Sequence, residues 1–167
     1  MLTKRPKMPK KNVTPSSGIE VNICTKCKTV AFDKQQIINL VSQTAEHFDV
    51  RKAQINIAIL DDRQIVDMNR RFLDKNGTTD VISFDISDDD SKEKTFDIAV
   101  NAQLAKKQAQ SRGHSPQAEL VLYILHGLLH NLGFDDTTSR KAAKMHETED
   151  DILEKFGFGA VYDAEKR

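Results

Sequence analysis

Residues 126–136 read His-Gly-Leu-Leu-His-Asn-Leu-Gly-Phe-Asp-Asp, and this segment organises the rest of the chain. Two histidines four residues apart on a helix lie on one face, about one turn or roughly 6 Å from each other, so both imidazoles can reach one metal ion. Gly133 is suited to end the helix, because glycine adopts the left-handed conformation that reverses the chain. The reversal would bring Asp136 back toward His126 and His130. The spacing therefore predicts three metal ligands and a fourth tetrahedral position open to water, as in catalytic zinc sites.

The helix that carries these histidines is expected to be the buried centre of the fold. Ser115 and Pro116 suit its N-cap and first turn, and residues 118–132 are apolar almost all the way round. Two imidazoles on one face of such a helix each need a polar partner, and one metal ion satisfies both. The alternative is that His126 and His130 are hydrogen-bonded core residues without a metal.

The reaction class stays open at this point, because Gly127 follows the first histidine. Metalloproteases with the motif H-E-x-x-H carry at that position the glutamate that activates the metal-bound water. A metal alone can lower the pKa of its water to near neutrality, and Asp135 is a nearby acid that could assist. Glu119, two turns before His126, has two interpretations: an acceptor for an imidazole N–H, or a first-turn acid favoured by the helix dipole. His114, in the preceding loop, is expected to be exposed.

The segment 126–136 resembles the motif H-G-x-L-H-L-x-G-Y-D-H of the YbeY family of rRNA-maturation endoribonucleases. A second block supports the resemblance: residues 68–75 read M-N-R-R-F-L-D-K and residues 79–84 read T-D-V-I-S-F, similar to the family's L-N-x-x-(F/Y)-R-x-K and T-(D/N)-V-L-S-F. Further partial matches are Phe96-Asp97-Ile98, to a G-D-I strand, and Met145 with residues 149–158, to a closing helix. Two motifs in the right order are much more specific than H-x-x-x-H alone.

The resemblance covers roughly residues 20 to 160. It implies a mixed α/β fold, one zinc ion per chain held by His126, His130 and Asp136, and cleavage of single-stranded RNA. In this family that activity serves 3′ maturation of small-subunit rRNA and ribosome quality control. The implied partners are single-stranded rRNA and the small ribosomal subunit, with no membrane.

Two positions depart from the family pattern. Asp136 stands where the third ligand is usually histidine; zinc accepts carboxylate oxygen, although an anionic ligand makes the metal a weaker Lewis acid. His146 is an alternative third ligand, but it lies far along the next helix. Leu73 stands where the family commonly has an arginine thought to contact the RNA phosphate. Arg70, three residues earlier on the same helix face, could replace that arginine.

Length and composition indicate one cytoplasmic domain. The chain has 167 residues, enough to bury a core, and its 25 basic and 25 acidic residues give a net charge of zero. The chain as a whole therefore lacks the excess positive charge that is typical of nucleic-acid binders, which weighs mildly against an RNA substrate. We see neither an apolar run of about 20 residues nor a secretory signal.

The expected fold is a single α/β domain, with a small mixed sheet of four strands surrounded by helices. Asp97, inside the fourth strand, needs a polar partner, and the second helix is expected to bury Ile65, Met68 and Phe72. The predicted strands are 19–23, 55–59, 80–85 and 95–100, and the predicted helices are 33–48, 62–73, 104–110, 116–132 and 139–156.

The two ends of the chain are expected to lie outside this domain. Residues 1–18 carry five basic residues and no acid, and they are predicted to form a disordered tail that either only solubilises the chain or grips RNA. The domain would span residues 19–160, with a frayed end at 161–167. Cys24 and Cys27 form a C-x-x-C without a second pair, so a metal or redox role is disfavoured.

These observations favour a zinc-dependent endoribonuclease acting on single-stranded rRNA. Arg70 or Lys75 would hold the phosphate, and Asp135 would act near the metal. Two alternatives remain: a metallohydrolase of another substrate class, and a non-catalytic ribosome-assembly factor that zinc stabilises. Gly127 argues against the first alternative, whereas Leu73 keeps the second open.

Overall fold

The computed structural model describes residues 18–162, in which four strands form one mixed sheet in the order β1-β2-β4-β3. Strands β1, β2 and β4 are parallel, and β3 pairs with β4 in the antiparallel sense. The predicted single α/β domain with a four-stranded mixed sheet is thereby confirmed. The strands are β1 (Gly18–Thr25), β2 (Lys52–Leu60), β3 (Val81–Asp85) and β4 (Lys94–Asn101).

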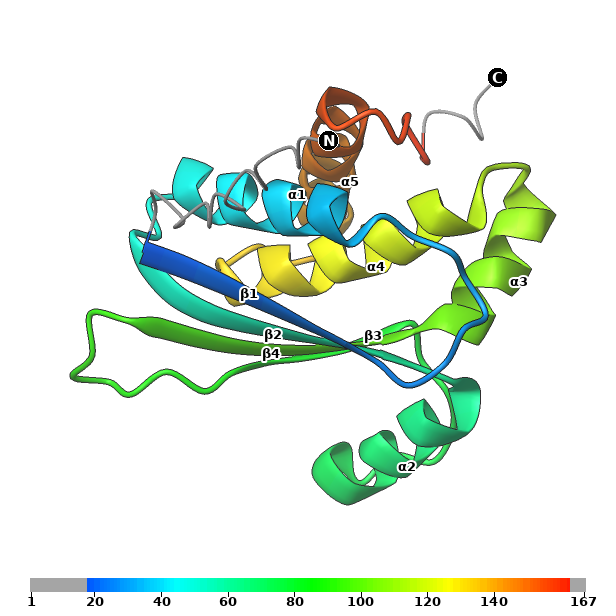
Figure 1. Ribbon diagram of the computed structural model, residues 1–167, viewed down its shortest axis with the longest axis horizontal. Coiled ribbons are helices and arrows are strands. Elements are labelled where there is room, and N and C mark those ends of the chain that lie inside the picture. Colours follow the sequence, from blue (N-terminus) through cyan, green and yellow to red (C-terminus); the bar gives the residue numbers. More distant parts are fainter. Residues whose placement is uncertain (1–17, 163–167) are drawn as a thin grey trace, which may run out of the picture.

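Helices cover the two faces of the sheet unequally. Figure 1 shows α1 (Lys34–His47) and α4 (Pro116–Asn131) over one face, with α5 (Ser139–Lys155) beyond them. The other face carries α2 (Asp62–Leu73), while α3 (Ala102–Arg112) leads from the end of β4 to the start of α4. None of the helices in the described part of the chain has the length and apolar character needed to span a bilayer.

Helix α4 is the buried centre of the fold, as predicted. Its N-cap Ser115 accepts a hydrogen bond from the backbone N–H of Ala118, and Pro116 lies in its first turn. From Ala118 to Leu129 every residue except His126 is buried. Each fully buried leucine on this helix stabilises the fold by roughly 1.5–3 kcal/mol relative to an exposed one. His126 is therefore held by a helix with almost no freedom to shift.

Gly127 lets α4 lie unusually close to the sheet. A Cβ atom at this position would be 2.9 Å from Cγ2 of Val81, 3.1 Å from Cγ2 of Ile98 and 3.3 Å from Cβ of Ser83. Branched side chains cannot move such atoms aside cheaply. The close packing therefore disfavours the glutamate that an H-E-x-x-H peptidase would need at this position.

The second face of the sheet is only partly covered, and this corrects one prediction. Phe72, expected in the core, is 63% exposed, while Met68 is half-buried and Ile65 is fully buried. Leu73 is 39% exposed. Helix α2 packs on the sheet around Ile65, and in its last turn the ring of Phe72 meets that of Phe84 edge-on, with centroids 6.1 Å apart, while most of the Phe72 side chain stays exposed.

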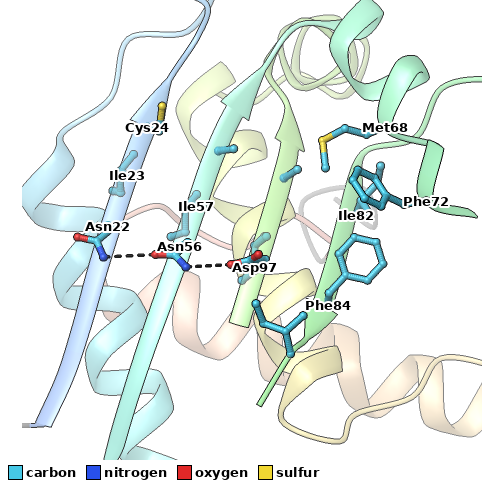
Figure 2. A pocket seen from close by; sticks show the side chains of 14 residues that line it. Asn22, Ile23, Cys24, Asn56, Ile57, Met68, Phe72, Ile82, Phe84 and Asp97 are labelled. Carbon is cyan, nitrogen blue, oxygen red and sulfur yellow. Dashed lines mark hydrogen bonds between the residues drawn. The ribbon is translucent and has the colours of Figure 1, made fainter. Parts of the chain in front are cut away.

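A groove of about 700 Å³ lies on this open face, beside α2 (Figure 2). Its polar part is a row of three side chains, in which Asn22 donates to Asn56 over 3.3 Å and Asn56 donates to Asp97 over 2.9 Å. Asp97 thus has the polar partner that its place in a strand required. Cys24 points into the same groove, and Cys24 and Cys27 are both free thiols.

The chain ends differ in part from the expected boundaries. Residues 1–17, most of the predicted basic tail, lie outside the described residues, but Gly18 already belongs to β1. The prediction of fraying from residue 161 is wrong for its first two residues. Val161 is buried, and the backbone N–H groups of Val161 and Tyr162 donate to Asp150 over 2.8 and 3.1 Å. Residues 163–167 lie outside the described range.

Candidate metal centre

Three side chains from one helix and the turn after it converge on a common point. Nε2 of His126 and Nε2 of His130 are 3.0 Å apart, and each lies 3.6 Å from Oδ2 of Asp136. Among residues 18–162 they are the one group of three or more such side chains close enough to hold a metal ion. The structure therefore brings together the three side chains that the sequence suggested as metal ligands.

The chain reversal at Gly133 places the carboxylate. Helix α4 ends at Asn131, and Gly133 has a φ of 97°, in the left-handed region that favours glycine. The N–H of Gly133 donates to the carbonyl of His130 over 3.0 Å, and that of Phe134 donates to the carbonyl of Leu129 over 2.9 Å. These bonds close the helix end and direct the following residues back toward the histidines.

The two imidazoles are held by acceptors on their other nitrogen atoms. Nδ1 of His126 lies 2.6 Å from Oε1 of Glu149, and Nδ1 of His130 lies 3.1 Å from the carbonyl oxygen of Phe134. Carboxylates and carbonyls only accept, so both Nδ1 atoms carry a proton, and in the neutral imidazoles both Nε2 atoms present lone pairs. Two lone pairs that face each other at 3.0 Å repel unless a proton or a cation lies between them.

The separations suit a tetrahedral cation. Bonds of about 2.0–2.1 Å from a central zinc place tetrahedral ligand atoms about 3.3 Å apart. The observed 3.0, 3.6 and 3.6 Å bracket that value. Two imidazole nitrogens with one carboxylate oxygen are also a donor set that zinc accepts readily. The residues present therefore fit a metal ion of this kind.

Negative charge around His126 favours its protonated form when no cation is present. Burial is the largest single influence and lowers the pKa of His126, but the hydrogen bond with Glu149 and its charge, with those of Asp80 and Asp136, outweigh burial and raise the pKa above 6.5. Glu149 is fully buried. The site therefore attracts positive charge, whether a proton or a metal.

Glu119 does not serve the histidines of this centre, which corrects one interpretation. Its fully buried carboxylate instead pairs with Arg112, Nη1 to Oε1 at 3.0 Å, and contacts His114 through Oε2. His114, expected to be exposed, has a side chain only 12% exposed. The first turn of α4 faces the end of α3, so the carboxylate meets that helix rather than His126.

Asp135 precedes Asp136 in the chain, but its carboxylate is bonded to other residues. Its carboxylate accepts hydrogen bonds from the backbone N–H and the hydroxyl of Thr137, and it pairs with Lys141 at 2.7 Å. The hydrogen bond from Lys141 and then those from Thr137 lower the pKa of Asp135 to about 2. Such a carboxylate is a weak base at neutral pH, and its contacts fix the turn before α5.

The structure does not bring Arg70 or Lys75 to the three ligands. Both side chains are exposed, on α2 and in the loop that follows it, and α2 lies on the face of the sheet opposite α4 (Figure 1). His146 is also separate from the cluster, because its ring stacks on Tyr162 with centroids 3.9 Å apart.

Sequence reasoning missed Glu149 as the partner of His126. The residue lies on α5, 23 positions after the histidine, and reaches it only because α5 packs on α4. One signal was available in the sequence. Glu149 lies on the face of a predicted amphipathic helix that is expected to pack against the core. An acid at a core position needs a polar partner.

Comparison with known proteins gives a consistent family. A family model described as "Endoribonuclease YbeY" matches residues 22–157. Proteins named "Endoribonuclease YbeY" from Sulfurovum sp. strain NBC37-1 and Bacillus velezensis are 31% and 30% identical to this chain over 135 and 149 residues. These matches cover 77% and 82% of this chain, and 90% and 95% of the two relatives.

A solved structure supports the fold alone. The solution structure of a protein from Thermotoga maritima is similar with a TM-score of 0.52 at 16% sequence identity. The similarity covers 83% of this chain and 91% of that protein.

Proposed function

The chain belongs to the YbeY family of endoribonucleases, and on this basis we propose that it is a zinc-dependent endoribonuclease that cleaves single-stranded RNA. Its biological substrate would be the 3′ region of small-subunit rRNA, during maturation and ribosome quality control. The observation that carries the proposal is the convergence of His126, His130 and Asp136 at 3.0 to 3.6 Å.

The three side chains would hold the zinc ion, and neighbouring groups would orient them. When bound, zinc supplies a Lewis acid and lowers the pKa of a coordinated water. Glu149 and the carbonyl of Phe134 keep the Nδ1 protons in place, so that both Nε2 atoms stay available as ligands. His126, His130 and Asp136 are each partly exposed, which gives a large substrate access to them.

Packing weighs against a peptidase of the H-E-x-x-H type. That mechanism requires a glutamate beside the first histidine, where even a Cβ atom on Gly127 would lie 2.9 Å from Cγ2 of Val81. A non-catalytic, zinc-stabilised assembly factor would contain the same three ligands. A cleavage assay distinguishes such an assembly factor from a nuclease.

The test compares cleavage of a single-stranded oligoribonucleotide by the wild type and by His130→Ala, each with and without a chelator. We expect the chelator and the substitution each to reduce cleavage more than about 100-fold. The matched control is His47→Ala, an exposed histidine on α1, which should cleave like the wild type. Zinc content is measured on every sample, and we expect one ion per wild-type chain and less in His130→Ala.

Two results would overturn the proposal. Cleavage that survives both chelation and the substitution would identify a contaminating nuclease. Zinc-dependent thermal stability without any cleavage would favour the assembly factor.

A further inference from the structure

The segment that follows α5 turns back along that helix and reaches the neighbourhood of the proposed metal ligand His126. Figure 1 shows the segment in red. Gly157 and Gly159 have φ values of 83° and 76°, in the left-handed region that reverses a chain. The reversal brings Tyr162 to a cavity of about 180 Å³ that His126 also lines. Tyr162, the last residue that the structure describes, therefore lies next to the proposed metal centre.

Two residues of α5 hold Tyr162 in place. Asp150 is buried and accepts hydrogen bonds from the backbone N–H of Val161 over 2.8 Å and from that of Tyr162 over 3.1 Å. The ring of Tyr162 stacks on the ring of His146, with centroids 3.9 Å apart and an interplanar angle of 12°. The backbone and the ring of this tyrosine are therefore both fixed by contacts with α5.

The hydroxyl of Tyr162 is directed at Glu149. It donates a hydrogen bond to this carboxylate, and burial, the charge of Glu149 and that bond raise the pKa of Tyr162 above 10. A phenol that keeps its proton is a hydrogen-bond donor toward a carboxylate. Oε1 of Glu149 lies 2.6 Å from Nδ1 of His126. One buried carboxylate therefore connects the tyrosine with the histidine.

We propose that Tyr162 is a positioning residue of the metal centre, and that it holds Glu149 in the orientation that fixes the Nδ1 proton of His126. The inference rests on the proposed zinc-dependent function and deepens it, because Tyr162 acts on the site through Glu149. His146, which the sequence suggested as an alternative metal ligand, serves instead as the surface on which Tyr162 stacks.

The burial of Glu149 explains why one more donor matters. The residue has no exposed surface, so the charge of its carboxylate must be satisfied by hydrogen bonds from the protein. His126 offers it a single N–H. Without the hydroxyl of Tyr162, the carboxylate would turn toward another donor or toward water that enters, and the ring of His126 would lose its fixed acceptor.

The test removes the hydroxyl and leaves the ring. Tyr162→Phe keeps the stack on His146, but Glu149 loses a donor. The matched control is Tyr123→Phe. Tyr123 lines the same cavity, and its hydroxyl bonds to Glu119, an equally buried carboxylate that pairs with residues other than the proposed ligands. Each variant therefore loses one hydroxyl bonded to a buried carboxylate, and the two should lose similar stability.

Two quantities are compared in these variants and the wild type. In the metal-free protein, NMR of the imidazole nitrogens gives the tautomer of His126 and the rate at which its Nδ1 proton exchanges with water. Competition with a chromophoric chelator gives the zinc affinity. We expect Tyr162→Phe to exchange this proton faster and to bind zinc about 10-fold more weakly. Tyr123→Phe should match the wild type in both quantities, although its thermal midpoint falls as much as that of Tyr162→Phe.

A second pair of variants tests the stacked ring. His146→Ala removes the surface beneath Tyr162 and should also weaken zinc binding. His146→Phe restores a ring, so its zinc affinity should return to within about 2-fold of the wild type. Phenylalanine has no metal-binding atom, so this rescue would also exclude His146 as a ligand. Equal losses in the two variants would overturn the role given to His146.

The outcomes separate this proposal from the proposed function. Nδ1 exchange and zinc affinity that change equally in Tyr162→Phe and Tyr123→Phe, or in neither, would overturn the role of Tyr162, while zinc binding and cleavage by the wild type stand. Faster Nδ1 exchange in Tyr162→Phe alone, in a protein whose wild type binds no zinc, would support the positioning of His126 and contradict the zinc-dependent function.

Discussion

Nδ1 of His126 lies 2.6 Å from Oε1 of Glu149, a carboxylate without exposed surface. The contact joins α4 to α5 and fixes which nitrogen of the imidazole carries the proton. It also brings a negative charge behind the histidine, which makes Nε2 a stronger ligand. Glu149 is thus expected to position His126 and to strengthen metal binding without touching the metal.

Glu149→Gln should therefore weaken zinc binding by about 10- to 100-fold. The amide keeps a hydrogen-bond acceptor for Nδ1–H but removes the charge, so the ring keeps its orientation and loses basicity. Competition with a chromophoric zinc chelator measures the change. Glu147→Gln, an exposed acid on the same helix, is the matched control and should bind zinc like the wild type. Equal affinities for the two variants would show that Glu149 serves only the fold.

Zinc should stabilise the protein more strongly as the pH rises. The pKa of His126 is raised above 6.5, because the bond with Glu149 and its charge, and those of Asp80 and Asp136, outweigh burial. In the metal-free protein, the stability that this proton contributes is fully present below pH 6.5 and is lost as the pH rises through the raised pKa. Zinc requires Nε2 without its proton, so its affinity increases over the same interval.

The measurement for this pH dependence is the difference in thermal midpoint with and without zinc. We expect the difference to grow from below pH 6.5 to above the raised pKa of His126. In Glu149→Gln the growth should begin at lower pH, because the main cause of the raised pKa is gone. A difference that stays constant with pH would contradict the assignment of His126 as a ligand.

Local rules predicted the centre of the fold well. The spacing of His126 and His130, with a glycine three residues later, was sufficient to predict the cluster of the three side chains. Helix geometry and the left-handed conformation of glycine depend only on nearby residues. The contacts between elements far apart in the sequence could not be predicted in this way. The partner of His126 comes from another helix, and Phe72 is exposed because it borders an open groove on the sheet face that α2 covers only in part. Neither fact has a strong signal in the local pattern.

Gly127→Ala should destabilise the protein, although alanine favours helices. The added Cβ would lie 2.9 Å from Cγ2 of Val81 and 3.1 Å from Cγ2 of Ile98. Overpacking costs roughly 1–3 kcal/mol, and better helix propensity offsets about 1 kcal/mol, so we expect a net loss of up to about 2 kcal/mol. Urea unfolding measures it.

A double-mutant cycle with Val81→Ala identifies the cause of the Gly127→Ala effect. Truncating Val81 removes the nearest atom, so the double variant should be more stable than the sum of the two single effects predicts. Strict additivity would instead assign the loss to another contact.

Asp135→Asn should leave most of the cleavage activity intact. A general base must hold a proton during the reaction, and it works best with a pKa near the working pH. Lys141 and Thr137 hold the pKa of Asp135 at about 2, so its carboxylate has little tendency to take a proton at neutral pH. We therefore expect kcat to change less than about 10-fold, far less than in His130→Ala, and the zinc content to stay unchanged.

The measurement is kcat across a pH series for wild type, Asp135→Asn and Lys141→Met. If Asp135 were the base, the asparagine variant would lose cleavage as completely as a ligand variant does. Removing Lys141 would then shift the acidic limb of the pH profile upward, because the pKa of Asp135 would rise.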